Sequence, residues 1–432
     1  MSQASAAMTD THTERASQVI DRCRQIADCT EVAGEITRTF LSPPMHKVHA
    51  LLREWMEAAG MQVRVDAVGN LRGVWAGLTP EAPRLLIGSH LDTVPNAGAF
   101  DGILGVVMGV SIVEELRWER LPFAIEVIGF SEEEGVRFSR PFLGSLALVG
   151  KLDDEILALT DSNGITVAEA IDHFGLGVLD DSGLERAEAA EGTFAYLEFH
   201  IEQGPLLESE KLPLGIVSAL VGQSRLLLHF TGAANHAGTT PMHLRHDAMA
   251  ATAEWIGVVE KIAALHNGLV ATVGSVQTKP GAGNVIAGEV NATLDLRHAD
   301  DATRAIALHE ILNAAQQAAD ARGVTVRWEQ HMDQPAVPLD AELIDLLDAA
   351  ARGAGFEPRH MVSGAGHDAM IVAGSIKSCM LFLRTPGGVS HHPSETVLPE
   401  DIEAALAAGL EFIQLLQPLA AEHTPSTKNI LQ

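Results

Sequence analysis

The chain has little cysteine and little positive charge. Its three cysteines, Cys23, Cys29 and Cys379, are too few for a disulfide framework and lie in no metal-ligand spacing, which fits a reducing compartment. Lysine and arginine number 29 against 57 aspartate and glutamate residues, so the formal charge is −28. This balance repels nucleic acid and anionic membrane surfaces, and we expect neither as a partner.

Long apolar runs are also missing. Residues 1–24 are polar and mixed in charge, without the apolar segment of a secretory signal, and we find no stretch that approaches the ~20 apolar residues of a membrane span. We therefore expect a cytoplasmic protein. Hydrophobic residues still make up 47% of the 432 positions, which is enough for two domains with cores of their own.

Short apolar segments alternate with helical patterns in the first 130 residues. Segments 84–90 and 123–130 are typical of buried strands, and helical spacing occurs within 15–60 and at about 102–118. Strands that alternate with helices predict an α/β domain with a mostly parallel sheet. In such sheets, functional sites form at the carboxyl ends of the strands.

The pattern changes from about residue 214. The order strand, helix, strand, strand, helix, strand is predicted for residues 226–232, 247–264, 269–276, 289–296, 301–321 and 324–330. This order is typical of a ferredoxin-like unit. The simplest organisation is a catalytic domain of residues 1–212 plus 332–432, interrupted by an inserted lid of residues 213–331.

Five short segments together carry the ligands for a two-metal site. Two divalent ions about 3.5–4 Å apart need roughly five or six nitrogen and oxygen ligands, including a carboxylate that can bridge. Three histidines, an aspartate and a glutamate meet this need, and they imply hydrolysis of a polarised carbonyl. The segments are His90-Leu91-Asp92, Asp101-Gly102, Glu132-Glu133-Glu134-Gly135, His200-Ile201-Glu202-Gln203-Gly204-Pro205 and Ser390-His391-His392-Pro393.

Each segment taken alone also has a structural interpretation. Asp101 before a helix is more often an N-cap, and a single histidine at a strand end is usually structural. The row of glutamates could be a solvated acidic turn, although like charges are disfavoured unless a cation or proton relieves them. Adjacent His391 and His392 point apart, so we expect at most one of them to bind metal. The joint occurrence of the segments favours the metal site.

Seven longer segments follow one another through nearly the whole chain. They are GSHLDTVPNAGAFDG (88–102), EEEGVRF (132–138), HIEQGP (200–205), NHAGTTPM (235–242), LDLRHAD (294–300), GAGHDAM (364–370) and SHHPSE (390–395). They resemble the M20-type amidohydrolases that act on ureides: allantoate amidohydrolases, N-carbamoyl-L-amino-acid hydrolases and β-ureidopropionases. The resemblance implies a metal-binding catalytic domain and a lid through which two subunits form a homodimer.

The resemblance also implies a ligand set. His90, Asp101 and His200 would hold one ion, and Asp101, Glu134 and His391 would hold the second, with Asp101 bridging. A set of histidines and carboxylates without thiolates suits Zn²⁺, Mn²⁺ or Co²⁺. The related M20 peptidases have a carboxylate where His200 stands, which favours ureides as substrates.

Other residues receive catalytic roles by the same resemblance. Glu133 would be the general base, because the two glutamates directly before Gly135 match the family's pair. Asp92 would orient a neighbouring group, as carboxylates beside metal ligands commonly do. Glu132 is the additional glutamate and should be dispensable, and His392 occupies a variable place.

The lid residues would decide the substrate class. His236 matches a residue that polarises the scissile carbonyl, often in the partner subunit's site. Asn284 and Arg297 match residues that bind a substrate carboxylate, for which the bidentate arginine fork is suited. The alternative for Arg297 is a salt bridge to a neighbouring aspartate, Asp295 or Asp300. Gln203 would contact the ureido group.

These observations predict metal-dependent hydrolysis of the terminal ureido C–N bond of a small, carboxylate-bearing ureide. The segments 130–138 and 142–145 look closest to the allantoate branch, in which allantoate gives ureidoglycine, ammonia and CO₂. The first alternative is an N-carbamoyl-L-amino-acid hydrolase. A peptidase of the same fold and a non-catalytic ureide-binding protein are further alternatives.

Overall fold

The chain forms two compact units. The computed structural model describes residues 3–116, 119–177 and 192–423. The first unit comprises Met1–Ser218, Leu339–Met361 and Gly366–Gln432, and the second comprises Ala219–Pro338 and Val362–Ala365. The lid boundaries inferred from the sequence, 213 and 331, remain predictions.

The first unit is built on a mixed sheet with parallel strands at its centre. β3 pairs in parallel with β4 and β5, and β5 pairs in parallel with β16, whereas β1, β2 and β6 join by antiparallel pairing. The sheet order is β1-β2-β4-β3-β5-β16-β6, with β15 beside β6. The short strand β14 pairs with Ala219 and Leu220 at the end of β6, and these paired residues belong to the second unit. The strands are β1 (Gln62–Val65), β2 (Leu71–Trp75), β3 (Arg84–His90), β4 (Ala124–Phe130), β5 (Thr193–Ile201), β6 (Leu214–Leu220), β14 (Val337–Pro338), β15 (Arg359–Ser363) and β16 (Ser378–Leu383).

The central strands are apolar because helices cover them. α3 (Ile103–Leu116) is apolar nearly all round, as expected for a fully enclosed helix, and it packs on β3, β4 and β5. α1 (Gln3–Ala27) and α13 (Pro399–Leu415) contact α3 and each other, while α2 (Met45–Ala58) packs on β1 and β2. Further helices are α4 (Leu143–Leu148), α5 (Asp154–Leu157), α6 (Val167–His173), α8 (Leu206–Glu210), α11 (Ala341–Gly353), α12 (Asp368–Val372) and α14 (Gln417–Glu422), with a 3₁₀ turn η2 at Pro386–Gly388.

Contrary to the expectation from the sequence, one segment among the described residues has the length and hydropathy of a membrane span. Pro399–Glu422 has a mean hydropathy of 1.4 over its most apolar window. In the structure 56% of that window is buried, and α13 packs against α1, α3, α11 and β16. Its apolar character is thus explained by its place in the core.

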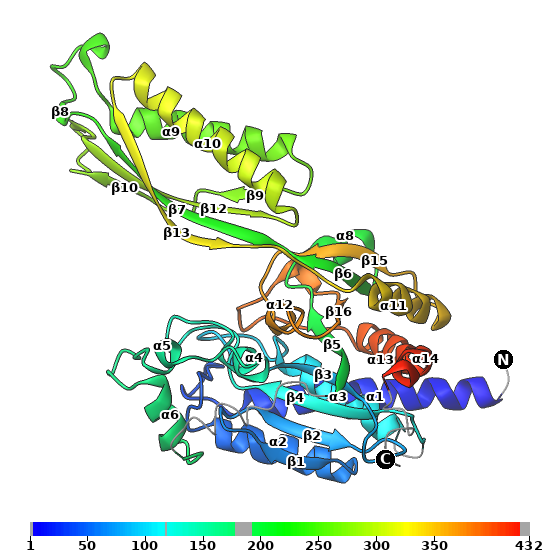
Figure 1. Cartoon of the computed structure of the whole chain (residues 1–432). Coiled ribbons are helices and arrows are strands. Elements are labelled where there is room, and N and C mark those ends of the chain that lie inside the picture. Colours follow the sequence, from blue (N-terminus) through cyan, green and yellow to red (C-terminus); the bar gives the residue numbers. More distant parts are fainter. Residues whose placement is uncertain (1–2, 117–118, 178–191, 424–432) are drawn as a thin grey trace, which may run out of the picture. The chain divides into compact units, whose positions relative to one another are not determined.

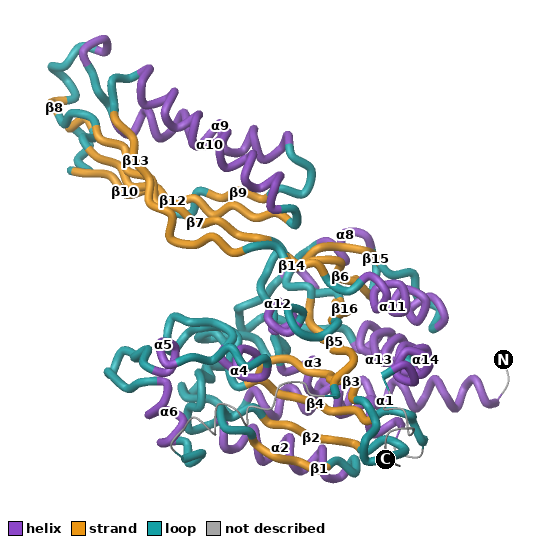
Figure 2. The backbone as a smooth tube through the Cα atoms, in the orientation of Figure 1, coloured by secondary structure: helices purple, strands orange, loops and turns teal. Residues whose placement is uncertain are grey.

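The second unit consists of a twisted antiparallel sheet with two helices along one face (Figure 2). The strand order is β10-β12-β7-β13, with β9 also beside β12. The single strand expected at 269–276 is divided into β9 and β10, so this sheet has five strands where the expected ferredoxin-like succession has four. Every second residue of β7 and β12 is buried under the helices. The elements are β7 (Gly222–Thr231), α9 (Ala248–Leu265), β9 (Val270–Thr272), β10 (Val276–Lys279), β12 (Glu289–His298), α10 (Asp301–Ala321) and β13 (Thr325–Gln334).

A small second ladder extends the second unit. β8 (Asn235–His236) pairs with β11 (Val285–Ile286), and a 3₁₀ turn, η1, follows at Met242–Leu244. β8 lies beyond the end of the main sheet that Thr231 and Glu289 form (Figure 1). Two-residue strands leave no periodic pattern, so nothing in the sequence predicts this ladder.

Candidate metal centre

The carboxyl ends of β3 and β5 bring two histidines together. His90 is the last residue of β3 and His200 the penultimate residue of β5, and both rings are buried. Their Nε2 atoms lie 3.4 Å apart, and they lie 3.4 Å and 3.2 Å from Oδ1 of Asp101. These three side chains converge, as the sequence predicts.

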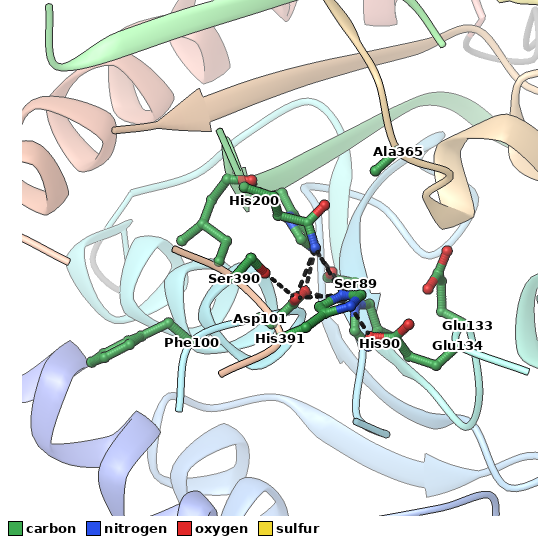
Figure 3. Close-up of polar contacts among 12 residues, drawn as sticks. Ser89, His90, Phe100, Asp101, Glu133, Glu134, His200, Ala365, Ser390 and His391 are labelled. Atoms are coloured by element: carbon green, nitrogen blue, oxygen red, sulfur yellow. Dashed lines mark hydrogen bonds and ion pairs between the residues drawn. The ribbon is translucent and has the colours of Figure 1, made fainter. Parts of the chain in front are cut away.

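The other oxygen of Asp101 faces a second group of side chains. Its Oδ2 lies 3.3 Å from Nε2 of His391, and the same nitrogen lies 3.5 Å from Oε1 of Glu134. The three histidine rings turn toward the Asp101 carboxylate (Figure 3). Asp101 therefore belongs to both groups, one through each oxygen, which is the arrangement of a carboxylate that bridges two cations.

The donor atoms fit a divalent cation. Nδ1 of His90 lies 3.0 Å from the Asp92 carbonyl and Nδ1 of His200 lies 2.9 Å from the Ile201 carbonyl. Since a carbonyl only accepts, each Nδ1 carries the proton, and in the neutral ring the lone pair of Nε2 faces Asp101. Oδ1 of Asp101 is buried and accepts no hydrogen bond from the described residues. With neutral rings, lone pairs thus converge around Oδ1 of Asp101 without a donor from the described residues.

The pKa values show that carboxyl groups crowd one another in the buried centre. Burial and then the neighbouring Asp101 raise the pKa of Glu134 to about 7. Burial and then Glu134 raise the pKa of Glu133 well above its usual value. Burial opposes ionisation of Asp101 too, but the adjacent rings of His200, His391 and His90 hold its pKa well below the usual range. A divalent cation would relieve this repulsion, so the centre is suited to divalent-metal binding.

Asp92 holds the glutamate segment in place. Its two carboxylate oxygens accept hydrogen bonds from the backbone N–H groups of Glu133 (2.9 Å) and Glu134 (3.1 Å). Its Oδ1 also lies 3.4 Å from Nδ1 of His90. Asp92 therefore connects β3 with the turn after β4. Glu132 is fully buried, and burial and then Asp92 raise its pKa well above normal.

Gln203 contacts the centre directly. Its backbone is in the left-handed region (φ 59°), and its Nε2 donates to Oδ2 of Asp101 at 2.7 Å. The predicted contact of Gln203 with substrate stays a prediction. Of the two adjacent histidines, only His391 faces the centre, whereas Nδ1 of His392 lies 2.7 Å from Oγ of Ser394.

Three neighbours of the centre were missed from the sequence. Ser390 donates to Asp101, Glu395 accepts from the backbone of Asp101, and the ring centroid of His367 lies 4.3 Å from that of His200. Burial and then His200 hold the pKa of His367 well below normal. Ser390 and Glu395 lie in the SHHPSE segment, and His367 lies in GAGHDAM, so the motifs themselves were the available signal.

The predicted lid residues fall into two places within the second unit. Pairing of β8 with β11 sets His236 beside Val285, and the backbone N–H of Ala237 donates to the carbonyl of Asn284 at 2.9 Å. His236 is exposed. Arg297 lies on β12, eight residues from Glu289, which marks the end of that strand nearest the ladder. His236 and Asn284 are thus neighbours, and Arg297 is remote from both.

Arg297 makes the salt bridge considered as its alternative role. Its Nε and Nη2 donate to the carboxylate of Asp295 at 2.8 Å and 3.0 Å, and its Nη1 donates to the Gly364 carbonyl at 2.6 Å. A guanidinium has five N–H donors, so these bonds leave two. Arg225 also donates to Asp295, so the three side chains retain a net positive charge.

A mixed α/β unit with this ligand set at its strand ends has the features of a metal-dependent hydrolase. The chain belongs to the peptidase family M20/M25/M40, whose model matches residues 86–415. This finding confirms the family resemblance.

Individual relatives cover almost the whole chain. Allantoate deiminase 1 of Glycine max is 38% identical over 430 residues, covering 92% of this chain and 89% of that protein. An N-carbamoyl-L-amino-acid amidohydrolase of Pseudomonas sp. (strain NS671) is 37% identical, with 85% and 90% covered. The crystal structure of a hydantoinase/carbamoylase family amidase from Burkholderia ambifaria matches with a TM-score of 0.86 at 35% identity, covering 93% and 97%. The predicted α/β fold class is thus confirmed, except that the sheet of the first unit is mixed and not mostly parallel, since β1, β2 and β6 join it by antiparallel pairing.

Proposed function

We propose that this protein hydrolyses the terminal ureido C–N bond of a small, carboxylate-bearing ureide, with allantoate as the preferred substrate. The observation that carries the proposal is the Asp101 carboxylate set between His90 and His200 on one side and His391 and Glu134 on the other. The similarity to an allantoate deiminase over 92% of the chain supports the substrate. The products would be ureidoglycine, ammonia and CO₂.

The residues of the centre supply the chemistry around two divalent ions. Such ions, when bound, polarise the scissile carbonyl and lower the pKa of water. Glu133 lies beside Glu134 at the edge of the ligand set and would take a proton from the attacking water and return it to the leaving amine. Asp92 keeps Glu133 and Glu134 in place through their backbone N–H groups. Zn²⁺, Mn²⁺ and Co²⁺ all suit the donors.

Arg297 would bind the substrate carboxylate. Its hydrogen bonds with Asp295 and the Gly364 carbonyl fix the guanidinium plane and leave two N–H donors. Arg225 also pairs with Asp295, so the three side chains together keep one positive charge. A fixed fork with two donors matches a carboxylate better than a lysine would. His236 would stabilise the oxyanion, and Asn284 would assist in binding.

The positions of these lid residues favour a homodimer with shared sites. Eight residues of extended strand separate Arg297 from Glu289, which is about 26 Å at ~3.3 Å per residue. His236 and Asn284 lie beyond the Glu289 end, so one small ureide cannot reach them and Arg297 of the same lid. We therefore propose that each site takes Arg297 from its own subunit and His236 and Asn284 from the partner.

An N-carbamoyl-L-amino acid is the second candidate substrate. It carries the same ureido and carboxylate groups, and the Pseudomonas relative supports it at 37% identity. A dipeptide is the third, because the family is named for peptidases. A non-catalytic binding protein is the least supported alternative, since no predicted ligand or base is missing from the centre.

The test is ammonia release by chelator-treated protein to which Mn²⁺ or Zn²⁺ has been restored. Allantoate, N-carbamoyl-L-methionine and a dipeptide are compared at equal concentration, and dipeptide cleavage is followed by amine release. Selective turnover of allantoate is the expected result. If the carbamoyl amino acid is preferred, the proposed substrate is wrong but the proposed reaction, hydrolysis of a ureido C–N bond, still stands. Absence of turnover with all three, in protein that retains both ions, would contradict the proposed function.

A further inference from the structure

A buried carboxylate outside the predicted ligand set joins the two loops that carry Asp101 and His391. Glu395 is 5% exposed. Its Oε1 accepts hydrogen bonds from the backbone N–H groups of Phe100 (2.9 Å) and Asp101 (3.0 Å), residues almost 300 positions away in the sequence. Hydrogen bonds to a carboxylate are stronger than those between neutral groups. Glu395 therefore fixes the backbone from which the shared carboxylate of the metal centre projects.

Ser390 extends this connection to the Asp101 side chain. Its Oγ donates to Oδ2 of Asp101 at 2.9 Å (Figure 3) and lies 3.3 Å from Oε2 of Glu395. Asp101 is thus held at its backbone by Glu395 and at its carboxylate by Ser390. Both contacts come from the segment that also carries His391, so Asp101 and His391 are fixed relative to each other.

Gly98 shows how closely the two loops approach. A Cβ atom at this position would overlap with Cβ and Oε1 of Glu395. Gly98 is not among the residues with positive φ. The close approach, and not an unusual backbone conformation, therefore requires glycine here. The loop before Asp101 is shaped to receive the Glu395 carboxylate.

His391 is the ligand that most needs such a connection. Its side chain is 47% exposed, whereas those of His90 and His200 are almost fully buried at strand ends. Its backbone φ of 56° lies in the left-handed region, which non-glycine residues adopt at a cost of about 1–3 kcal/mol. Such a conformation persists only where neighbouring groups stabilise it. One of these groups is the backbone N–H of Glu395, which donates to the His392 carbonyl at 3.0 Å.

We propose that Glu395 and Ser390 are positioning residues for the metal position surrounded by Asp101, Glu134 and His391. The position between His90 and His200 also uses Asp101, but its two histidines come from the buried ends of β3 and β5, so we expect it to be less sensitive to Glu395 and Ser390. This inference rests on the two-ion site of the proposed function. Removal of a group that orients a metal ligand typically lowers metal affinity about 10–100-fold. We expect a loss of this size for one of the two ions.

The experiment measures metal binding without substrate. Metal-free wild type, Glu395→Ala, Ser390→Ala and Glu395→Gln are titrated with Mn²⁺ and Zn²⁺ by calorimetry, and the ions retained after dialysis are counted by elemental analysis. Glutamine keeps an oxygen that can accept from both N–H groups, and its amide can face Ser390. Glu395→Gln is therefore the conservative variant that should restore binding.

Asp66→Ala is the matched control. Asp66 is also 5% exposed, and one of its oxygens accepts from two backbone N–H groups, those of Val68 (3.1 Å) and Asn70 (2.9 Å). It lies outside the five ligand-bearing segments. Removal of this buried turn carboxylate should lower the melting temperature and leave the affinities for both ions unchanged.

The expected result is that Glu395→Ala and Ser390→Ala bind one ion with wild-type affinity and the second about 10–100-fold more weakly. The inference would be overturned if the variants bound both ions with wild-type affinity, or if the affinities for both ions fell equally. It would also be overturned if Asp66→Ala showed the same loss of affinity for one ion. If Glu395→Ala does not fold, Ser390→Ala decides alone. Selective loss of one ion in a protein that hydrolyses no ureide would refute the proposed function and leave this inference intact.

Discussion

A complementation experiment tests whether each site is shared between two subunits. His236→Ala and Arg297→Ala are each expected to be almost inactive. Because Arg297 lies about 26 Å along β12 from the lid end that carries His236, the two residues would serve different sites of the dimer. In a hybrid dimer, the subunit with intact Arg297 receives an intact His236 from its partner. One of its two sites is therefore complete, while the other lacks both residues.

The activity recovered in the mixture follows from the number of complete sites in each dimer. Random mixing of equal amounts makes about half of the dimers hybrids, each with one complete site, so roughly a quarter of wild-type activity should return. The variants are mixed under conditions that exchange subunits, and ammonia release is followed. His236→Ala mixed with Asn284→Ala is the control, because both changes lie at the same end of the lid and no complete site can form. Lack of recovery in the first mixture, with hybrids demonstrated by differential tags, would refute the shared site.

Three further predictions concern single residues. Glu133→Gln should lower kcat about 10²–10⁴-fold with both ions retained in elemental analysis, and turnover near wild type would remove Glu133 as the base. Arg297→Lys should raise KM for allantoate about tenfold or more with a smaller effect on kcat, since lysine lacks the fork; a change in kcat alone would contradict this role. Burial and then His46 lower the pKa of His49 from 6.5 to about 4. As the pH falls, His49 is therefore protonated in the unfolded chain before it is protonated in the folded one, and the free energy of unfolding decreases between pH 6.5 and pH 4. Urea unfolding at pH 7.5 and pH 4.5 measures this decrease in stability, and in His49→Leu the decrease should be smaller by on the order of 2–3 kcal/mol. The same decrease in the variant and the wild type would contradict the role of His49.

The parts of the centre that follow regular strands could be predicted from the sequence. The apolar runs of β3 and β5 are long enough to be recognised, and each delivers its histidine to the same edge of the sheet. The segments around Asp101, Glu134 and His391 are loops without a periodic pattern. Their assignment depended on family resemblance, and the structure places them within reach of one another.

Contacts between distant loops could not be predicted in this way. Glu395 and Asp101 are separated by 294 positions, and neither has a local pattern that points to the other. The β8–β11 ladder consists of two-residue strands, too short for any alternation, yet it sets His236 beside Val285, the sequence neighbour of Asn284, at one end of the second unit. The ion pair of Arg297 with Asp295 was one of two roles that the sequence left open, and its geometry is compatible with both.

The two oxygens of Asp101 differ in a way that bears on the order of metal binding. Oδ1 faces His90 and His200 and accepts no hydrogen bond from the described residues, so an ion there meets lone pairs already in place. Oδ2 accepts from Gln203 at 2.7 Å and from Ser390 at 2.9 Å, so an ion on that side has to share or displace a donor. The first position should therefore fill at lower metal concentration than the second. The loss of Ser390 or Glu395 is expected to act on the second position for a separate reason. His391 is exposed there and is held relative to Asp101 by the segment that carries both residues, and losing this orientation outweighs the removal of one donor from Oδ2.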